Sequence, residues 1–167
     1  MPRFVPILSL LGLLAACTPP ATQQQSASTL PPNIRPDLAE KWHPNGQIAW
    51  PPNDGCAAAP VSQTLPAGTL IDRFGSEGGT FFSPRGESYA ARAVPYVCSK
   101  MVYTVYRVDK PLHVQACKAA PWFDEPGGAT QYKTDEPAYK LRESGSIEVA
   151  TGDGSGNGKP ASPCGSP

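Results

Sequence analysis

Alternation between apolar and polar positions predicts strands in the middle of the chain. Residues 69–74 (TLIDRF) alternate, which places Arg73 on the face opposite to Asp72. Residues 102–108 (VYTVYRV) are rich in the β-branched and aromatic side chains that strands prefer. A short turn with a proline follows, and residues 112–117 resume the strand pattern. We therefore expect the last two segments to form a β-hairpin.

Shorter elements flank these strands. Residues 47–50 are a short apolar run stopped by two prolines, and residues 147–149 would form a last strand. Residues 88–93 contain alanines and suit one or two helical turns. A proline near its start and a glycine just beyond its end delimit a helix over about residues 136–144. The sum is a small, single α+β domain that is mostly β, with short helices and long proline-rich loops.

The two ends of the chain differ in composition from this body. A short apolar run after one arginine is typical of an export signal and too short to span a bilayer. It ends in LAAC, which resembles a bacterial lipobox with Cys17 as the lipidated residue; ordinary secretion is the alternative. We predict a signal peptide (1–16), a flexible linker (17–36), a folded domain (37–150) and a loose Gly/Ser/Pro-rich tail (151–167). The protein is then lipid-anchored at the cell envelope, or else secreted.

Charge and cysteine content narrow the expected partners. Loss of the signal peptide removes one arginine and leaves 13 Lys and Arg against 14 Asp and Glu, a balance that argues against nucleic acid. An even number of further cysteines in an exported chain predicts two disulfides, with the pairing left open. These cysteines are Cys56, Cys98, Cys117 and Cys164. A zinc site is the alternative, but CxxC and HxxxH spacings are missing, so no metal is expected.

Common catalytic patterns are also missing from the sequence. It has no GxSxG and only two histidines, which gives little support to a Ser-His-Asp hydrolase. The glycine-rich residues 72–86 (DRFGSEGGTFFSPRG) match neither GxxxxGK[ST] nor GxGxxG, so alone they predict a turn between strands. Arg73 and Arg92 are candidates for binding phosphate, because a guanidinium matches phosphate oxygens bidentately. Surface ion pairs are the alternative role for both.

Several separate blocks, in order, resemble the TNT domain family of the tuberculosis necrotizing toxin and of fungal surface NAD glycohydrolases. They are TLIDRFGSEGGTFFSPRGESYAARAVPY (69–96), YTVYRVDKPLHV (103–114) and APWFDEPGGATQY (120–132), and residues 40–55 and 141–149 look similar too. Several ordered blocks are more specific than any one of them. The resemblance implies a TNT-like fold and cleavage of NAD to nicotinamide and ADP-ribose, with NAD as substrate and no cofactor.

The resemblance also implies roles for individual side chains. Gln131 matches the glutamine regarded as essential for hydrolysis, and it would hold a ribose hydroxyl or position the attacking water. The predicted catalytic residues are Gln131 and Arg92, and the predicted NAD-binding residues are Arg73, Phe81, Phe82 and Trp122. Asp124 and Glu125 depart from the family pattern and would add negative charge near the pyrophosphate.

The chemistry of NAD suits this sparse set of residues. Nicotinamide leaves as a neutral molecule from a cationic pyridinium, so the leaving group needs no general acid, unlike in ordinary glycoside hydrolysis. One alternative is ADP-ribosyl transfer or cyclisation, for which Asp124 and Glu125 are the nearest acidic pair. Another is an inactive, lipid-anchored envelope protein that binds nucleotides. The family resemblance further suggests a toxin role with an immunity protein as partner.

Overall fold

The computed structural model describes Met1, residues 31–38 and 41–150, and Cys164. The predicted signal peptide after Met1, the lipidation site Cys17, most of the linker and most of the tail lie outside the described residues. Within them, no helix is long and apolar enough to cross a membrane.

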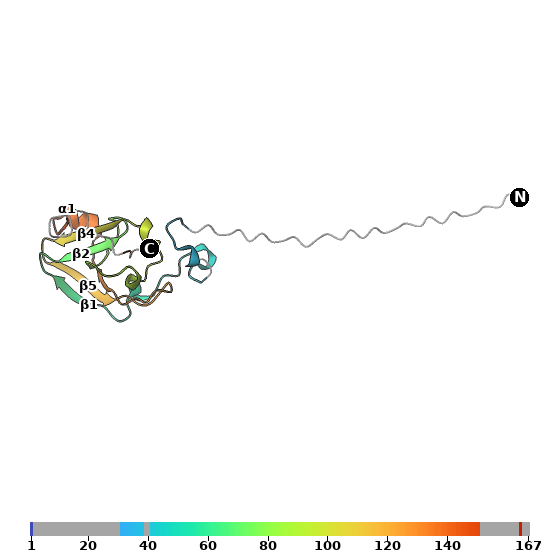
Figure 1. Ribbon diagram of the computed structural model, residues 1–167, viewed down its shortest axis with the longest axis horizontal. Helices are drawn as coiled ribbons and strands as arrows, with labels where there is room; N and C mark the ends of the chain where they lie inside the picture. The colour runs from blue at the N-terminus through green and yellow to red at the C-terminus, as the bar shows by residue number, and fades with distance from the viewer. Residues whose placement is uncertain (2–30, 39–40, 151–163, 165–167) are drawn as a thin grey trace.

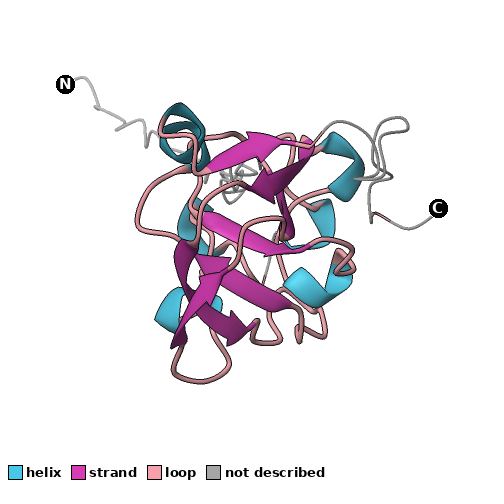
Figure 2. Ribbon diagram, turned by 90° about the vertical axis from the view of Figure 1, so that its left-hand side faces the viewer, coloured by secondary structure: helices cyan, strands magenta, loops and turns pink. Residues whose placement is uncertain are grey.

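Seven antiparallel strands form one sheet in the order β1-β5-β6-β3-β2-β4-β7 (Figure 1). Their bounds are β1 (Val61–Leu65), β2 (Leu70–Phe74), β3 (Phe81–Pro84), β4 (Tyr103–Val108), β5 (Leu112–Lys118), β6 (Thr130–Lys133) and β7 (Ile147–Val149). In Figure 2 the strand arrows run at clearly different slopes, as in a strongly twisted sheet. This small, mostly β architecture is the predicted fold class.

The short strand β3 joins the two halves of the sheet. Its first residues, Phe81 and Phe82, pair with β6, which belongs to the β1-β5-β6 half. Its last residues, Ser83 and Pro84, pair with β2, which belongs to the β2-β4-β7 half. The side chains of both halves therefore meet around β3.

The hairpin expected between residues 102–108 and 112–117 is wrong. The two segments are the strands β4 and β5, but β4 pairs with β2 and β7, whereas β5 pairs with β1 and β6. The turn is tied to another loop instead, because Asp109 and Lys110 donate their backbone N–H groups to the carbonyl of Ser146, at 2.9 and 3.3 Å. After this turn, the chain passes from the β2-β4-β7 half of the sheet to the β1-β5-β6 half.

The other local expectations met mixed outcomes. The short element expected at residues 47–50 is wrong: this segment has no regular secondary structure, and the two prolines that follow it cannot donate to a ladder. Strands β1 and β3 were not expected. Residues 88–93 contain a single turn of 3₁₀-helix, η4 (Ala90–Arg92). The other 3₁₀ turns are η1 (Pro36–Leu38), η2 (Pro44–Gly46), η3 (Asn53–Gly55) and η5 (Cys98–Lys100).

The predicted C-terminal helix is confirmed as α1 (Ala138–Glu143), which lies by the β4–β7 end of the sheet (Figure 1). Its buried Ala138 and Leu141 pack into a core that also contains Phe82 and Tyr106 from the centre of the sheet. Two disulfides are present, as predicted. Their pairing is Cys56–Cys117 and Cys98–Cys164, and the second ties a residue of the tail to η5.

Candidate functional site

A small cavity lies where β3 meets β2 and β6. Its volume is about 80 Å³. Five of the six predicted site residues line it, and these are Arg73, Phe81, Phe82, Arg92 and Gln131. Ligand sites are commonly about 300–1,000 Å³, so this cavity can enclose only part of a dinucleotide.

Arg73 brings an uncompensated positive charge to this cavity. It lies on β2 with only 6% of its surface exposed, and its Nη1 donates to the carbonyl of Phe81 at 3.3 Å. Within the described residues, its Nε has no hydrogen-bond partner and no carboxylate forms an ion pair with it. Burial lowers the pKa of Arg73, and the nearby Tyr106 and Glu77 oppose that shift. A buried guanidinium without a counter-ion favours the binding of an anion.

Gly79 makes room for the Arg73 guanidinium. A Cβ at position 79 would lie 2.0 Å from Nη2 and 2.5 Å from Nη1 of Arg73. The backbone of Gly79 is not left-handed, so the requirement is for space and not for conformation. The glycine-rich segment is the turn between β2 and β3, as predicted from its sequence, and one of its glycines serves the site directly.

Arg92, by contrast, is already paired. Its Nη1 lies 2.6 Å from Oδ1 of Asp72, an ion pair whose contact is not aligned as a hydrogen bond, and Asp72 is completely buried. Nε and Nη2 of Arg92 donate to the carbonyl of Glu87, at 3.3 and 2.9 Å. The other oxygen of Asp72 accepts from the Tyr103 hydroxyl at 2.8 Å and from Gly86 N at 3.2 Å. Arg92 therefore lines the cavity with most of its charge compensated.

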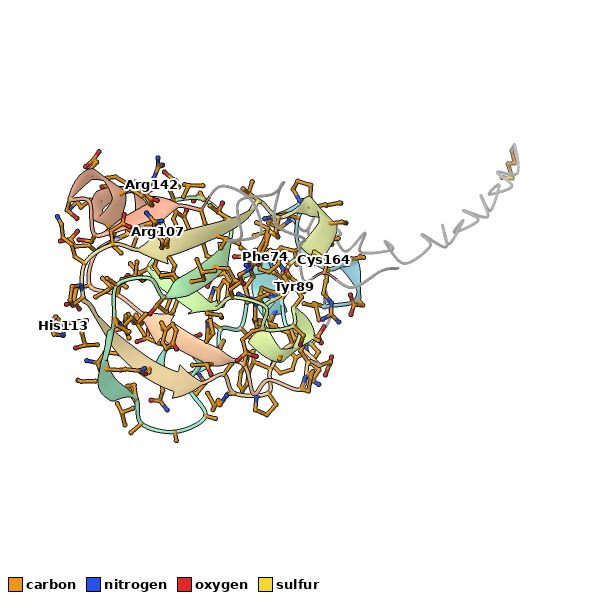
Figure 3. All side chains as sticks on the ribbon, turned by 60° about the vertical axis from the view of Figure 1, so that its left-hand side comes forward. Phe74, Tyr89, Arg107, His113, Arg142 and Cys164 are labelled. Atoms are coloured by element: carbon orange, nitrogen blue, oxygen red, sulfur yellow. A yellow bond between two sulfur atoms is a disulfide. The ribbon has the colours of Figure 1, made fainter. Side chains whose placement is uncertain are left out.

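Aromatic rings fix this ion pair in place. The guanidinium of Arg92 lies 5.1 Å from the ring centre of Phe74, which also lines the cavity. Phe74 contacts the rings of Tyr89 and Tyr103 at 4.7 and 4.9 Å, and Figure 3 shows Phe74 and Tyr89 side by side. Burial, followed by the hydrogen bond to Asp72, raises the pKa of Tyr103. Tyr103 therefore stays a neutral donor to Asp72 at physiological pH.

The two phenylalanines of β3 differ in exposure. Phe82 is almost fully buried, packs edge-on against Tyr106 at 5.8 Å and lies 5.5 Å from the Arg73 guanidinium. Phe81 is 41% exposed, and Lys133 Nζ lies 5.9 Å from its ring centre. Phe81 can thus offer its ring to a ligand, whereas Phe82 supports Arg73 from within the core.

Gln131 lies on β6, opposite Cys117 of β5. Its Nε2 donates to the backbone carbonyl of Asp54 at 2.9 Å and lies 3.8 and 3.7 Å from the sulfurs of Cys56 and Cys117. A carbonyl only accepts hydrogen bonds, so the nitrogen of the amide must face Asp54. The amide oxygen is then the end that remains to accept a hydrogen bond at the cavity.

Trp122 is not among the described residues that line the cavity. Its indole N–H donates to the carbonyl of Ala49 at 2.7 Å, and its ring lies 4.9 Å from that of Trp42. The acidic pair lies on the same loop and is likewise engaged elsewhere. Asp124 pairs with Lys41, and Glu125 pairs with Arg35. The negative charge expected near a pyrophosphate is therefore held by other cations.

Three features of the site were not anticipated from the sequence. These are the ion pair between Asp72 and Arg92, the space that Gly79 leaves for the Arg73 guanidinium, and the hydrogen bond from Gln131 to the Asp54 carbonyl. The alternation of residues 69–74 did separate Asp72 from Arg73, but it could not name the arginine that Asp72 meets. Among the described residues, no group of three or more His, Cys, Asp or Glu side chains could hold a metal ion.

Comparison with known proteins gives three findings. The sequence profile of the family described as Tuberculosis necrotizing toxin matches residues 64–149. The conidial surface nicotinamide adenine dinucleotide glycohydrolase of Aspergillus fumigatus is 37% identical over 115 residues, covering 59% of this chain and 49% of the relative. The chain thus spans about half the length of that relative. The structure of tuberculosis necrotizing toxin complexed with its immunity factor superposes with a TM-score of 0.58 at 20% identity, over 70% of this chain and 71% of the toxin chain, which shows a shared fold.

Proposed function

The chain belongs to the tuberculosis necrotizing toxin family, and from this premise we propose that it is an NAD glycohydrolase that releases nicotinamide and ADP-ribose. The observation that carries the proposal is the buried, uncompensated Arg73, which opens on the same cavity as Gln131. The name of the fungal relative supports NAD as the substrate.

Arg73 is the proposed anchor for the pyrophosphate of NAD. Its planar guanidinium can bind two phosphate oxygens, and a phosphate would supply the ion-pair partner that no carboxylate of the described residues provides. Phe81 stands at the same cavity with an exposed ring, suited to stacking on a flat base. These contacts would fix the dinucleotide with its nicotinamide ribose near Gln131.

The proposed chemistry needs no acid on the protein. The bond between the ribose C1′ and the pyridinium nitrogen breaks, nicotinamide departs neutral with the bonding electron pair, and water adds to the oxocarbenium-like centre and releases a proton to the solvent. The amide oxygen of Gln131 would accept a hydrogen bond from that water or from a ribose hydroxyl, because its nitrogen is occupied by Asp54. In either role, Gln131 orients a reacting group instead of transferring a proton.

Hydrolysis is better supported than transfer of ADP-ribose to another acceptor. The described residues that line the cavity include no Asp or Glu that could orient an acceptor. The acidic pair considered for that role is bound elsewhere, Asp124 by Lys41 and Trp42 and Glu125 by Arg35. Water is then the acceptor that the site favours.

Nicotinamide release by the purified protein tests the proposal. Gln131→Ala and Arg73→Ala should each lower kcat/KM for NAD by about 100-fold or more, because each removes a positioning contact. Gln115→Ala and Arg107→Ala are matched controls. Gln115 lies on the adjacent strand and donates to Ser62, and Arg107 lies on β4 away from Phe74 (Figure 3). Absence of nicotinamide release from the wild-type protein would refute the function.

We also propose export and lipid anchoring through Cys17. Two disulfides support an oxidising compartment outside the cytosol, and the fungal relative is named as a surface protein. Incorporation of an alkyne-labelled fatty acid by the full chain, abolished by Cys17→Ser, would support the anchor. An unlabelled wild-type chain would point to free secretion instead.

An immunity protein is the proposed protein partner. The toxin that shares this fold is described in complex with its immunity factor, and an exposed Phe81 at a concave site offers a contact for such a blocker. Protection of the producing cell by a co-expressed inhibitor would support this role. Undiminished growth of cells that make the active chain alone, in a cytosol that lets both disulfides form, would contradict it.

A further inference from the structure

A loop with an uncommon backbone conformation binds the amide nitrogen of Gln131, which is the end of the side chain that does not contact the reacting groups. Asn53, Asp54 and Gly55 of η3 all have left-handed backbone conformations, with φ of 53°, 54° and 82°. Left-handed backbone is uncommon for residues other than glycine, although Asn and Asp adopt it more readily than most, and three consecutive examples need support from their surroundings. The carbonyl at the middle of this run, that of Asp54, accepts the hydrogen bond from Gln131 Nε2 at 2.9 Å.

The surroundings that impose this conformation come from β5 and β6. Cys56, directly after the run, is joined by a disulfide to Cys117, which stands opposite Gln131 in the ladder. The carbonyl of Gly55 accepts from Ala120 N at 2.7 Å. The Asp54 carboxylate pairs with Lys133, two residues beyond Gln131 on β6, at 2.7 Å. The loop is thus fastened to the sheet on both sides of the Gln131 side chain.

We propose that residues 53–56, fastened by the Cys56–Cys117 disulfide, are a positioning device that orients the Gln131 amide for catalysis, so that opening this disulfide lowers turnover. Without the fastening, the left-handed run can relax and carry the Asp54 carbonyl away from Nε2. The Gln131 amide can then rotate, and its oxygen no longer points in one direction. This inference rests on the proposed NAD glycohydrolase function.

The second disulfide provides a matched control. Cys98–Cys164 has a sequence separation of 66 residues against 61 for Cys56–Cys117, so loss of either should affect the unfolded chain to a similar extent. Neither Cys98 nor Cys164 is among the described residues that line the cavity. A general loss of stability should therefore affect both double variants, whereas misorientation of Gln131 should affect only one.

The test compares Cys56→Ala/Cys117→Ala with Cys98→Ala/Cys164→Ala in the full chain. The first should lower kcat by about tenfold or more while KM for NAD changes less than about threefold, because Arg73 still binds the substrate. The second should keep the wild-type kcat. Equal kcat values in the two variants, or a change confined to KM, would overturn the proposal.

Two further measurements keep the test decisive. If the first double variant does not fold, Gly55→Ala retains the disulfide but disfavours φ of 82°, and it should also lower kcat with little change in KM. Hydrogen exchange of the Gln131 side-chain amide needs no activity. It should be slowed in the wild type and in the Cys98/Cys164 variant and fast in the Cys56/Cys117 variant. If exchange is slowed in the wild type but no nicotinamide is released, the positioning device is retained and the NAD glycohydrolase function is refuted. Fast exchange in the wild type would refute the positioning device itself.

Discussion

Replacement of Gly79 by alanine should disable the site without altering any residue that lines it. The new Cβ would lie 2.0 Å from Nη2 of Arg73 and 2.6 Å from its Cζ. Non-bonded heavy atoms prefer separations of about 3.5–4.0 Å, so the guanidinium must move by about 1.5 Å or more. The backbone of Gly79 is not left-handed, and the three atoms nearest to the new Cβ all belong to Arg73, so the clash falls on this side chain.

Two free energies follow from that displacement. Overpacking a well-filled interior costs about 1–3 kcal/mol of unfolding free energy. A misplacement of about 1 Å in a positioning group can lower the rate by about 100-fold, which corresponds to about 2.7 kcal/mol of transition-state stabilisation at about 1.36 kcal/mol per factor of ten. We expect kcat/KM for NAD to fall by about two orders of magnitude in Gly79→Ala.

Nicotinamide release and chemical unfolding, measured on the same preparations, test this reasoning. Gly78→Ala is the control, because a Cβ there would meet only Ser76 Oγ, at an ordinary 3.7 Å. In an Arg73→Ala background the Gly79→Ala change should no longer reduce stability, since the clashing group is gone. An active Gly79→Ala enzyme, or an equal effect of Gly78→Ala, would refute the argument.

Three other predictions concern charge and hydrogen bonding at the site. Asp72→Asn should reduce the free energy of unfolding by about 3–5 kcal/mol in urea titrations, because it leaves Arg92 buried without its counter-ion; a loss below about 1 kcal/mol would contradict the assigned ion pair. Gln131→Glu should be inactive at neutral pH, where a carboxylate cannot donate to Asp54. Its kcat should rise as the pH falls through about 4–5, where the protonated acid can donate, and a variant whose pH profile parallels that of the wild type would contradict this role. Inorganic pyrophosphate at about 100 times its Kd should stabilise the wild type by about 2.7 kcal/mol and Arg73→Ala much less, as thermal unfolding would show; equal stabilisation of both would remove Arg73 from the anion site.

The sequence predicts the helix α1 well, because single residues determine where it begins and ends. Pro137 is the N-cap residue of α1, and Gly145, with φ of 63°, lies just beyond its C-cap Ser144. Strand pairing was not readable in the same way. The partners of β4 in the sheet are β2, about thirty residues earlier, and β7, about forty residues later, and nothing in the turn after β4 encodes that choice. Strand β1 was missed because four of its five residues are exposed at the sheet edge, which removes the apolar signal of a strand.

The residues of the site were predicted by their resemblance to a family, but the resemblance could not rank them. Arg92 was predicted to be catalytic and Arg73 to bind NAD, and Phe82 and Trp122 were both predicted to bind NAD. Burial and pairing separate them: Phe82 belongs to the core, and Trp122 is hydrogen-bonded to a loop outside the cavity. Such differences depend on contacts between segments far apart in the chain, which local patterns do not contain.

Asp72 determines how charge is divided at the cavity. It is fully buried, and the cation it reaches is Arg92, which is also held by the Glu87 carbonyl. If Asp72 paired with Arg73 instead, the charge of the Arg73 guanidinium would be neutralised within the protein and would attract an anion less strongly. Because neighbouring residues of a strand face opposite sides, Asp72 and Arg73 are kept apart by the strand itself. The cavity is thus lined by Arg92, which is paired with a carboxylate, and by Arg73, which has no ion-pair partner among the described residues and is the proposed anchor for a phosphate.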